Sequence, residues 1–141
     1  MKYLLIYLLS ALLLHASGEN HQVKIIEKII SEISIDKKIV IWSDNKKILS
    51  ILENNSMFET TQRCNSATVI VLESKDTLPR KCSSKHIFVL NYKLLSEIPR
   101  SFGALFWKKG RPNIVILEPR VESQNIKITK DLEPYLEERV W

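Results

Sequence analysis

Three short apolar runs, separated by longer polar stretches, constrain the fold of this chain more than any other feature. They cover residues 39–42, 67–72 and 86–90. Each has the length and the nearly continuous apolarity of a strand that is buried on both faces. Buried strands that alternate with helical segments are typical of an α/β sheet whose strands run parallel. The sequence therefore predicts an α/β domain with parallel strands in its first part.

The segments around these runs carry helical patterns. Apolar residues recur at helical spacing over residues 23–33, and a second apolar helical face follows Asp44. Because aspartate is a favoured N-cap residue, we expect Asp44 to cap that second helix. A short helix is expected over 92–98 and a final helix over 130–139, and 118–125 is either a loop or a short helix.

Two further apolar runs, 102–107 and 113–117, are joined by a short stretch that contains Gly110 and Pro112. A connection this short requires antiparallel pairing, so these runs predict a hairpin at an antiparallel edge of the sheet. The length of 141 residues suits one domain, and 45% hydrophobic with 26% charged residues is the balance of a folding chain. We expect a single small α/β domain over 19–141, with a mixed, mostly parallel sheet of about five strands flanked by helices.

The first 18 residues have the pattern of a secretory signal peptide. Lys2 precedes an apolar run over 4–14, and this run is too short to span a bilayer. Ala16 and Gly18 are the two candidate residues before the cleavage point, and no transmembrane span is expected after cleavage. The predicted location is the periplasm. A buried N-terminal helix and an uncleaved anchor are the alternatives.

Cys64 and Cys82 are the two cysteines of the chain. An isolated pair in an exported protein predicts one disulfide, with free thiols or a metal site as alternatives. A metal site lacks further ligands, because His21 and His86 are the histidines that remain after cleavage. If the strands over 67–72 and 86–90 are parallel neighbours, both cysteines lie at the same amino-terminal edge and within bridging distance.

Polar residues follow each of the three buried runs. In parallel sheets the carboxyl ends of the strands form the usual ligand edge, so these residues are candidates for binding a small molecule. They are Ser43, Asp44, Ser74, Asn91 and Tyr92.

The hairpin segment combines aromatic and basic residues. Such a combination favours contact with a protein partner or with lipid headgroups, although a hairpin with one core face and a polar turn has the same pattern. The candidate partner-binding residues are Phe106, Trp107, Lys108, Lys109 and Arg111.

The sequence favours binding over catalysis. It has no Gly-x-Gly-x-x-Gly loop, no Gly-x-Ser-x-Gly elbow and no Cys-x-x-Cys motif, so it predicts no nucleotide cofactor, no hydrolase triad and no thioredoxin-like chemistry. Its formal net charge of +5 is spread along the chain rather than clustered, which argues against a nucleic-acid partner. We therefore expect neither an enzyme nor a metalloprotein.

The layout of residues 22–138 resembles the YfiR-like family of small periplasmic proteins. The likeness is carried by Cys-Asn-Ser-Ala-Thr-Val-Ile-Val at 64–71, by Gly103, by the Gly110-Arg111 turn and by the apolar run 114–117. Glu118-Pro119 departs from the family, which usually has an asparagine shortly after the last strand. The resemblance implies a non-enzymatic periplasmic regulator or sensor that binds an inner-membrane protein, in some members a diguanylate cyclase. A small-molecule binding module that uses the ligand edge is the alternative.

Overall fold

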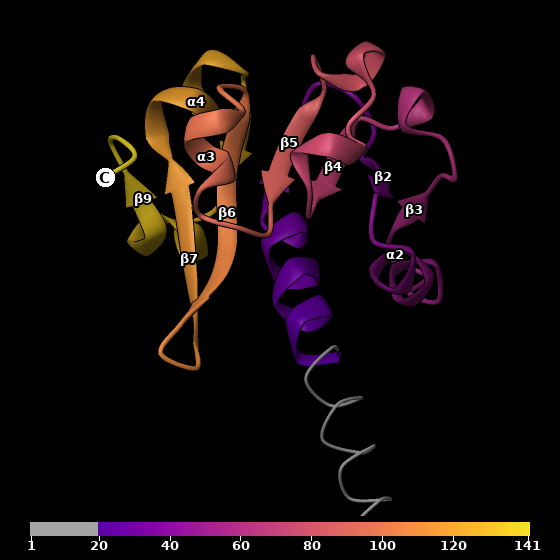
Figure 1. Ribbon diagram of the computed structural model, residues 1–141, viewed down its shortest axis with the longest axis horizontal. Helices are drawn as coiled ribbons and strands as arrows, with labels where there is room; N and C mark the ends of the chain where they lie inside the picture. The colour runs from indigo at the N-terminus through magenta and orange to yellow at the C-terminus, as the bar shows by residue number, and fades with distance from the viewer. Residues whose placement is uncertain (1–19) are drawn as a thin grey trace, which may run out of the picture.

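A seven-stranded mixed sheet forms the centre of the protein (Figure 1). The computed structural model describes residues 20–141, so the predicted signal peptide over 1–18 lies outside the described residues. In spatial order, the strands are β3 (Glu59–Thr60), β2 (Val40–Ser43), β4 (Val69–Leu72), β5 (His86–Val89), β6 (Ser101–Lys108), β7 (Arg111–Leu117) and β9 (Leu136–Glu137).

The α/β class and the mostly parallel sheet are confirmed. Strands β3, β2, β4, β5 and β6 run parallel, and β6 and β7 form the predicted antiparallel hairpin. The sheet has seven strands rather than about five, because β3 and β9 contain two residues each and are too short to give a periodic signal. The predicted position of the hairpin at the sheet edge is wrong, since β9 pairs parallel with the end of β7.

Four helices and several single turns surround the sheet. Residues 20–31 form the first described helix, followed by α2 (Lys46–Glu53), α3 (Leu94–Glu97) and α4 (Glu118–Ser123). The helix predicted over 130–139 is wrong: the 3₁₀ segment η4 (Lys130–Tyr135) leads directly into β9. Pro134 lies inside η4, where proline disfavours an α-helix. A separate two-stranded sheet pairs β1 (Ile33–Ser34) with β8 (Lys127–Ile128).

The central sheet is covered on both faces, which explains why the strands β4 and β5 are almost entirely apolar. Successive side chains of a strand point to opposite faces. Accordingly Val71 and Phe88 belong to the cluster that contains helix 20–31 and α2. Ile70 and Ile87 belong to the opposite cluster, which contains α3 and both cysteines. All four of these side chains are fully buried.

A disulfide joins Cys64 and Cys82, as predicted. Cys64 lies in the turn η1 (Cys64–Ser66) before β4, and Cys82 ends the turn η3 (Arg80–Cys82) before β5. The two Cα atoms are 6.1 Å apart. Because β4 and β5 are parallel neighbours, paired from Val69 with His86 onward, the disulfide links the two turns at the amino ends of these strands.

The hairpin turn is a two-residue loop. Lys108 pairs with Arg111, and the two residues between them both have positive φ, 52° at Lys109 and 74° at Gly110. This combination is that of a type I′ turn, which matches the twist of the flanking strands. The hairpin reaches the end of the molecule at which helix 20–31 begins (Figure 1), and the rings of His21 and Trp107 are 6.0 Å apart there.

Candidate functional site

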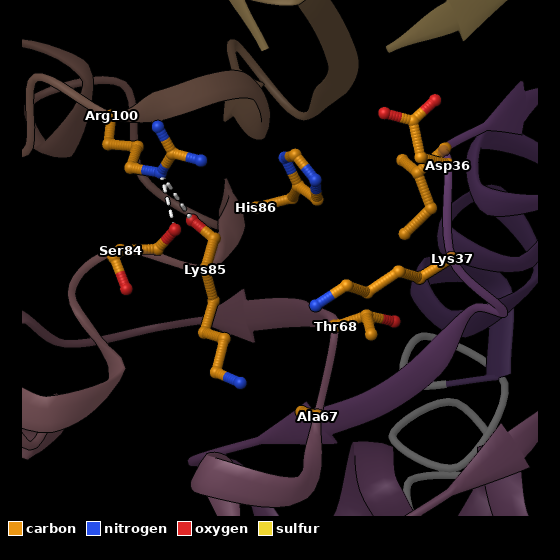
Figure 2. Close-up of a pocket in the computed structure, with 9 residues that line it drawn as sticks. Asp36, Lys37, Ala67, Thr68, Ser84, Lys85, His86 and Arg100 are labelled. Carbon is orange, nitrogen blue, oxygen red and sulfur yellow. Dashed lines mark hydrogen bonds between the residues drawn. The ribbon is translucent and has the colours of Figure 1, made fainter. Parts of the chain in front are cut away.

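A cavity of about 290 Å³ lies at the amino ends of the parallel strands. It is lined by Lys85, which precedes β5, by His86, the first residue of β5, and by Arg100 from the turn before β6. Lys37 and Asp36, from the segment before β2, line its other side (Figure 2). We call the group Lys37, Lys85, His86 and Arg100 the cationic pocket. The remaining lining residues are Ile35, Ala67, Thr68 and Ser84.

Arg100 is held in place by main-chain carbonyl groups. Its Nε donates to the carbonyl oxygen of Ser84 at 2.6 Å and to that of Lys85 at 3.2 Å. Both bonds come from the single Nε–H group and hold the guanidinium against the segment before β5. Within residues 20–141, the two terminal nitrogens of Arg100 have no hydrogen-bond partner, and Figure 2 shows the group extending toward the side of the pocket where His86 lies.

His86 is oriented by Gln124. The Gln124 side-chain nitrogen donates to the carbonyl oxygen of Arg100 at 2.9 Å, so its oxygen faces the ring of His86. That oxygen lies 2.9 Å from His86 Nδ1. An amide oxygen accepts hydrogen bonds, so Nδ1 carries the proton and Nε2 is left for other partners. Gln124 thereby couples the orientation of His86 to the backbone at Arg100.

The charge lining the pocket is mainly positive. Lys85 donates to the carbonyl oxygen of Asn65 at 3.1 Å, and its charge has no counterion among residues 20–141. The ammonium group of Lys37 makes no ion pair or hydrogen bond with any part of the chain that the structure describes. Asp36 is the acidic residue in the lining, and its carboxylate points away from the Lys37 ammonium in Figure 2. The arrangement is suited to holding an anion.

The predicted ligand edge lies at the opposite ends of the same strands. The structure brings Ser43, Asp44 and Ser74 together there, but their polar groups bind neighbouring loops. Asp44 accepts from the backbone N–H groups of Glu73 at 2.8 Å and Ser74 at 2.9 Å, and from the Thr77 hydroxyl at 2.5 Å. The buried hydroxyl of Ser43 accepts from the backbone N–H of Asn45.

The predicted capping role of Asp44 is wrong. The N-cap of α2 is Asn45, whose side-chain oxygen accepts from the backbone of Lys47 and Ile48. Asp44 is instead engaged by the loop after β4. Asn91 also has a local role, since its side chain accepts from the backbone of Lys93 at 2.9 Å.

Tyr92 follows the carboxyl end of β5 and packs with the hairpin residues. Its ring packs against Phe106 with centroids 5.0 Å apart, and its hydroxyl accepts from the backbone N–H of Trp141 at 2.8 Å. Together with Trp107 and Lys108, these residues line a cavity of about 550 Å³. We call the surface formed by Tyr92, Phe106, Trp107 and Trp141 the aromatic groove.

The aromatic groove is open to solvent, and one basic residue, Lys108, and one acidic residue, Glu137, lie in its lining. Trp107 is 45% exposed and Trp141 is 75% exposed. The guanidinium of Arg139 lies 4.1 Å from the centre of the Trp141 ring. Lys109 and Arg111, also predicted as partner-binding residues, lie at the exposed tip of the hairpin.

Two features of these sites were missed from the sequence. Trp141 was not a candidate, because its contact with Tyr92 depends on the position of β9 beside β7. The cationic pocket was not predicted, because ligand sites of parallel sheets usually lie at the carboxyl ends of the strands, whereas its basic residues precede strands. Lys37, Lys85 and Arg100 all precede a strand, and this shared position was the available signal.

The chain matches no protein-family model, and comparison with curated proteins finds no similar sequence. Within the described residues, no helix is long and apolar enough to cross a membrane, and no three metal-ligating side chains come together.

Proposed function

We propose that this protein is a non-enzymatic periplasmic regulator or sensor that binds an inner-membrane protein through the aromatic groove. The observation that carries the proposal is the exposure of two tryptophans, Trp107 and Trp141, beside the partly buried ring of Tyr92. Tryptophan and tyrosine are enriched among the residues that contribute most to protein–protein binding.

The charge around the groove favours an acidic partner. Lys108, Lys109 and Arg111 follow directly from Trp107 along the hairpin. Basic side chains at the rim of an interface accelerate association with an acidic surface and help to set the orientation of binding. Two exposed tryptophans beside a basic hairpin tip therefore fit a protein surface with an apolar pocket and an acidic border, although Glu137 also lines the groove.

The periplasmic location is supported by two features. The first 18 residues have the pattern of a signal peptide, and the described domain holds its two cysteines in a disulfide. Disulfides persist in oxidising compartments such as the bacterial periplasm. The regulatory role is supported by the resemblance to YfiR-like proteins. The alternative, a small-molecule module that uses the carboxyl ends of the strands, is less favoured, because Asp44 and Asn91 are engaged by neighbouring backbone groups.

Site-specific photocrosslinking in living cells tests the proposal. A photoreactive amino acid is placed at position 107 and, in a matched control, at Met57, which is 77% exposed and lies in the loop before β3 at the other edge of the sheet. We expect an adduct with an integral inner-membrane protein from position 107 and none from position 57. Adding Lys108→Glu and Arg111→Glu to the first protein should reduce that adduct.

Two results would contradict the proposal. Equal adducts from positions 57 and 107 would show non-specific contact. No adduct at position 107, in cells where the oxidised protein is exported, would show that the groove does not meet a membrane protein.

A further inference from the structure

We propose that the cationic pocket binds a small phosphate-containing anion. This site is separate from the aromatic groove, and the inference does not depend on the proposed protein partner. It rests on the convergence of Lys37, Lys85 and Arg100, which come from three segments far apart in the sequence, around one cavity of about 290 Å³.

The charge balance selects the class of ligand. Three basic side chains and one carboxylate, that of Asp36, line the cavity. A singly charged carboxylate ligand would leave part of this positive charge uncompensated, whereas a phosphate group carries close to two negative charges at neutral pH. The volume is small for a cofactor of drug size, so the anion is a phosphate or a small phosphorylated compound.

The donors are arranged for an oxyanion. Arg100 is fixed by the carbonyl groups of Ser84 and Lys85 through Nε, and its terminal nitrogens remain available. A fixed planar guanidinium binds two oxygens of a phosphate at once, and charge-assisted bonds of this kind are about twice as strong as neutral ones. Lys37 lines the same cavity and has no ion-pair or hydrogen-bond partner within the described residues, so its ammonium group is available to the anion.

The imidazole of His86 also lines the cavity. Its Nδ1 is occupied by Gln124, which leaves Nε2 for the ligand. Gln124 also donates to the carbonyl oxygen of Arg100, while the guanidinium of Arg100 is held by the carbonyl groups of Ser84 and Lys85. A pocket that pre-orients two of its polar groups loses less entropy when it binds than a flexible cluster of surface lysines.

Titration with inorganic phosphate tests the inference on the full exported chain with its disulfide intact. Binding is followed by isothermal calorimetry at constant ionic strength, and the site is mapped from backbone amide chemical shifts. We expect saturable binding with one site, and shift changes concentrated at residues 67–68, 84–86 and 100. Lys37→Gln should raise the Kd about tenfold, the loss expected for one hydrogen bond to a charged group.

Lys75→Gln is the matched control, because Lys75 is exposed in a turn at the carboxyl end of β4 and does not line the pocket. Its Kd should stay within about twofold of the unmodified protein, as one charge distant from a site has little effect at physiological salt. Arg100→Gln should abolish binding, and its unfolding midpoint is measured alongside. Glycerol 3-phosphate is titrated in the same way. A Kd lower than that of inorganic phosphate would indicate that the ligand is a phosphorylated metabolite, and a higher Kd would indicate free phosphate.

Three outcomes would overturn the inference. The first is the absence of saturable phosphate binding. The second is an equal loss of affinity in the Lys37 and Lys75 variants, which would indicate a general charge effect. The third is a set of shift changes spread over the basic surface rather than around the cavity. None of these results bears on crosslinking at position 107, so failure here and failure of the proposed function are distinguishable.

Discussion

Arg120 Nη1 lies 2.9 Å from the carbonyl oxygen of Ser101, although the β6–β7 hairpin separates the two residues in the sequence. The same nitrogen lies 2.8 Å from the carbonyl oxygen of Leu95 and 3.3 Å from that of Ile98. Burial lowers the pKa of Arg120 from its ordinary value, yet an arginine remains charged in proteins. One guanidinium therefore connects α4 to the junction between α3 and β6.

Replacing Arg120 should destabilise the domain. Arg120→Ala removes charged hydrogen bonds from the carbonyl groups of Leu95 and Ser101, and we expect a loss of about 1.5–3 kcal/mol in the free energy of unfolding. Arg120→Lys should recover only part of it, because an ammonium lacks the planar fork of donors. Urea unfolding of both variants measures this, and an unchanged midpoint for Arg120→Ala would contradict the connecting role.

Gly103 and Gly110 should resist substitution for different reasons. A Cβ atom at Gly103 would lie 2.7 Å from the carbonyl oxygen of Val115, so Gly103→Ala should cost about 1–3 kcal/mol of stability. Gly110 has open space around it but a φ of 74°. Asparagine tolerates this conformation better than alanine. In thermal unfolding, Gly110→Asn should therefore have a higher midpoint temperature than Gly110→Ala. At position 103 the asparagine variant should be no more stable than the alanine variant. The reverse order at either position would refute the explanation.

The disulfide should contribute a measurable part of the stability. Cys64 and Cys82 are 18 residues apart in the sequence. Closing a loop of that size stabilises by about 3 kcal/mol in the chain-entropy model. The double variant Cys64→Ala and Cys82→Ala should show this loss in urea, and a reductant should lower the midpoint of the unmodified protein but not that of the variant. A midpoint insensitive to reductant, with reduction confirmed by mass spectrometry, would argue against the prediction.

Stability should fall at acid pH in part through Glu32. Hydrogen bonds from Lys28 and, to a lesser extent, from the Thr129 hydroxyl lower the pKa of Glu32 below its ordinary value. Because the folded state favours the ionised carboxylate, the contribution is present above the ordinary glutamate pKa of about 4.3 and is lost as the pH falls through the lower folded value. Glu32→Gln should therefore flatten the decline in urea midpoint between about pH 5 and pH 2.

Lys28 belongs to the same cluster, and its contribution to stability is lost at alkaline rather than at acid pH. Hydrogen bonds to Glu32 and Asp131 raise its pKa, so its contribution is lost when the pH rises through that raised value. Glu122→Gln is the control for the loss of stability at acid pH, because Glu122 is exposed and its carboxylate makes no ion pair within the described residues. If Glu122→Gln changes the fall of the urea midpoint at acid pH as much as Glu32→Gln does, then the Lys28–Glu32 cluster is not the cause of that fall.

Local pattern was enough to predict the larger elements. The runs that became β2, β4 and β5 are nearly continuously apolar because helices and turns cover both faces of the sheet, and such a run has few other stable arrangements in water. The hairpin followed from the short connection at Lys109 and Gly110, and the disulfide followed from the export pattern and the parallel neighbours. These features depend on residues close in sequence, or on a single strand pairing.

Tertiary structure alone decided which polar groups meet. Asn45 rather than Asp44 caps α2, because the loop after β4 supplies two backbone donors that bind Asp44 in the folded protein. β9 exists because the end of β7 offers unpaired backbone groups to Leu136 and Glu137, which have no strand pattern of their own. The cationic pocket likewise forms only when the register of β2, β4, β5 and β6 brings the residues before those strands to one edge. A sequence determines how apolar each segment is, but the distance between two distant polar side chains is a property of the whole packed sheet.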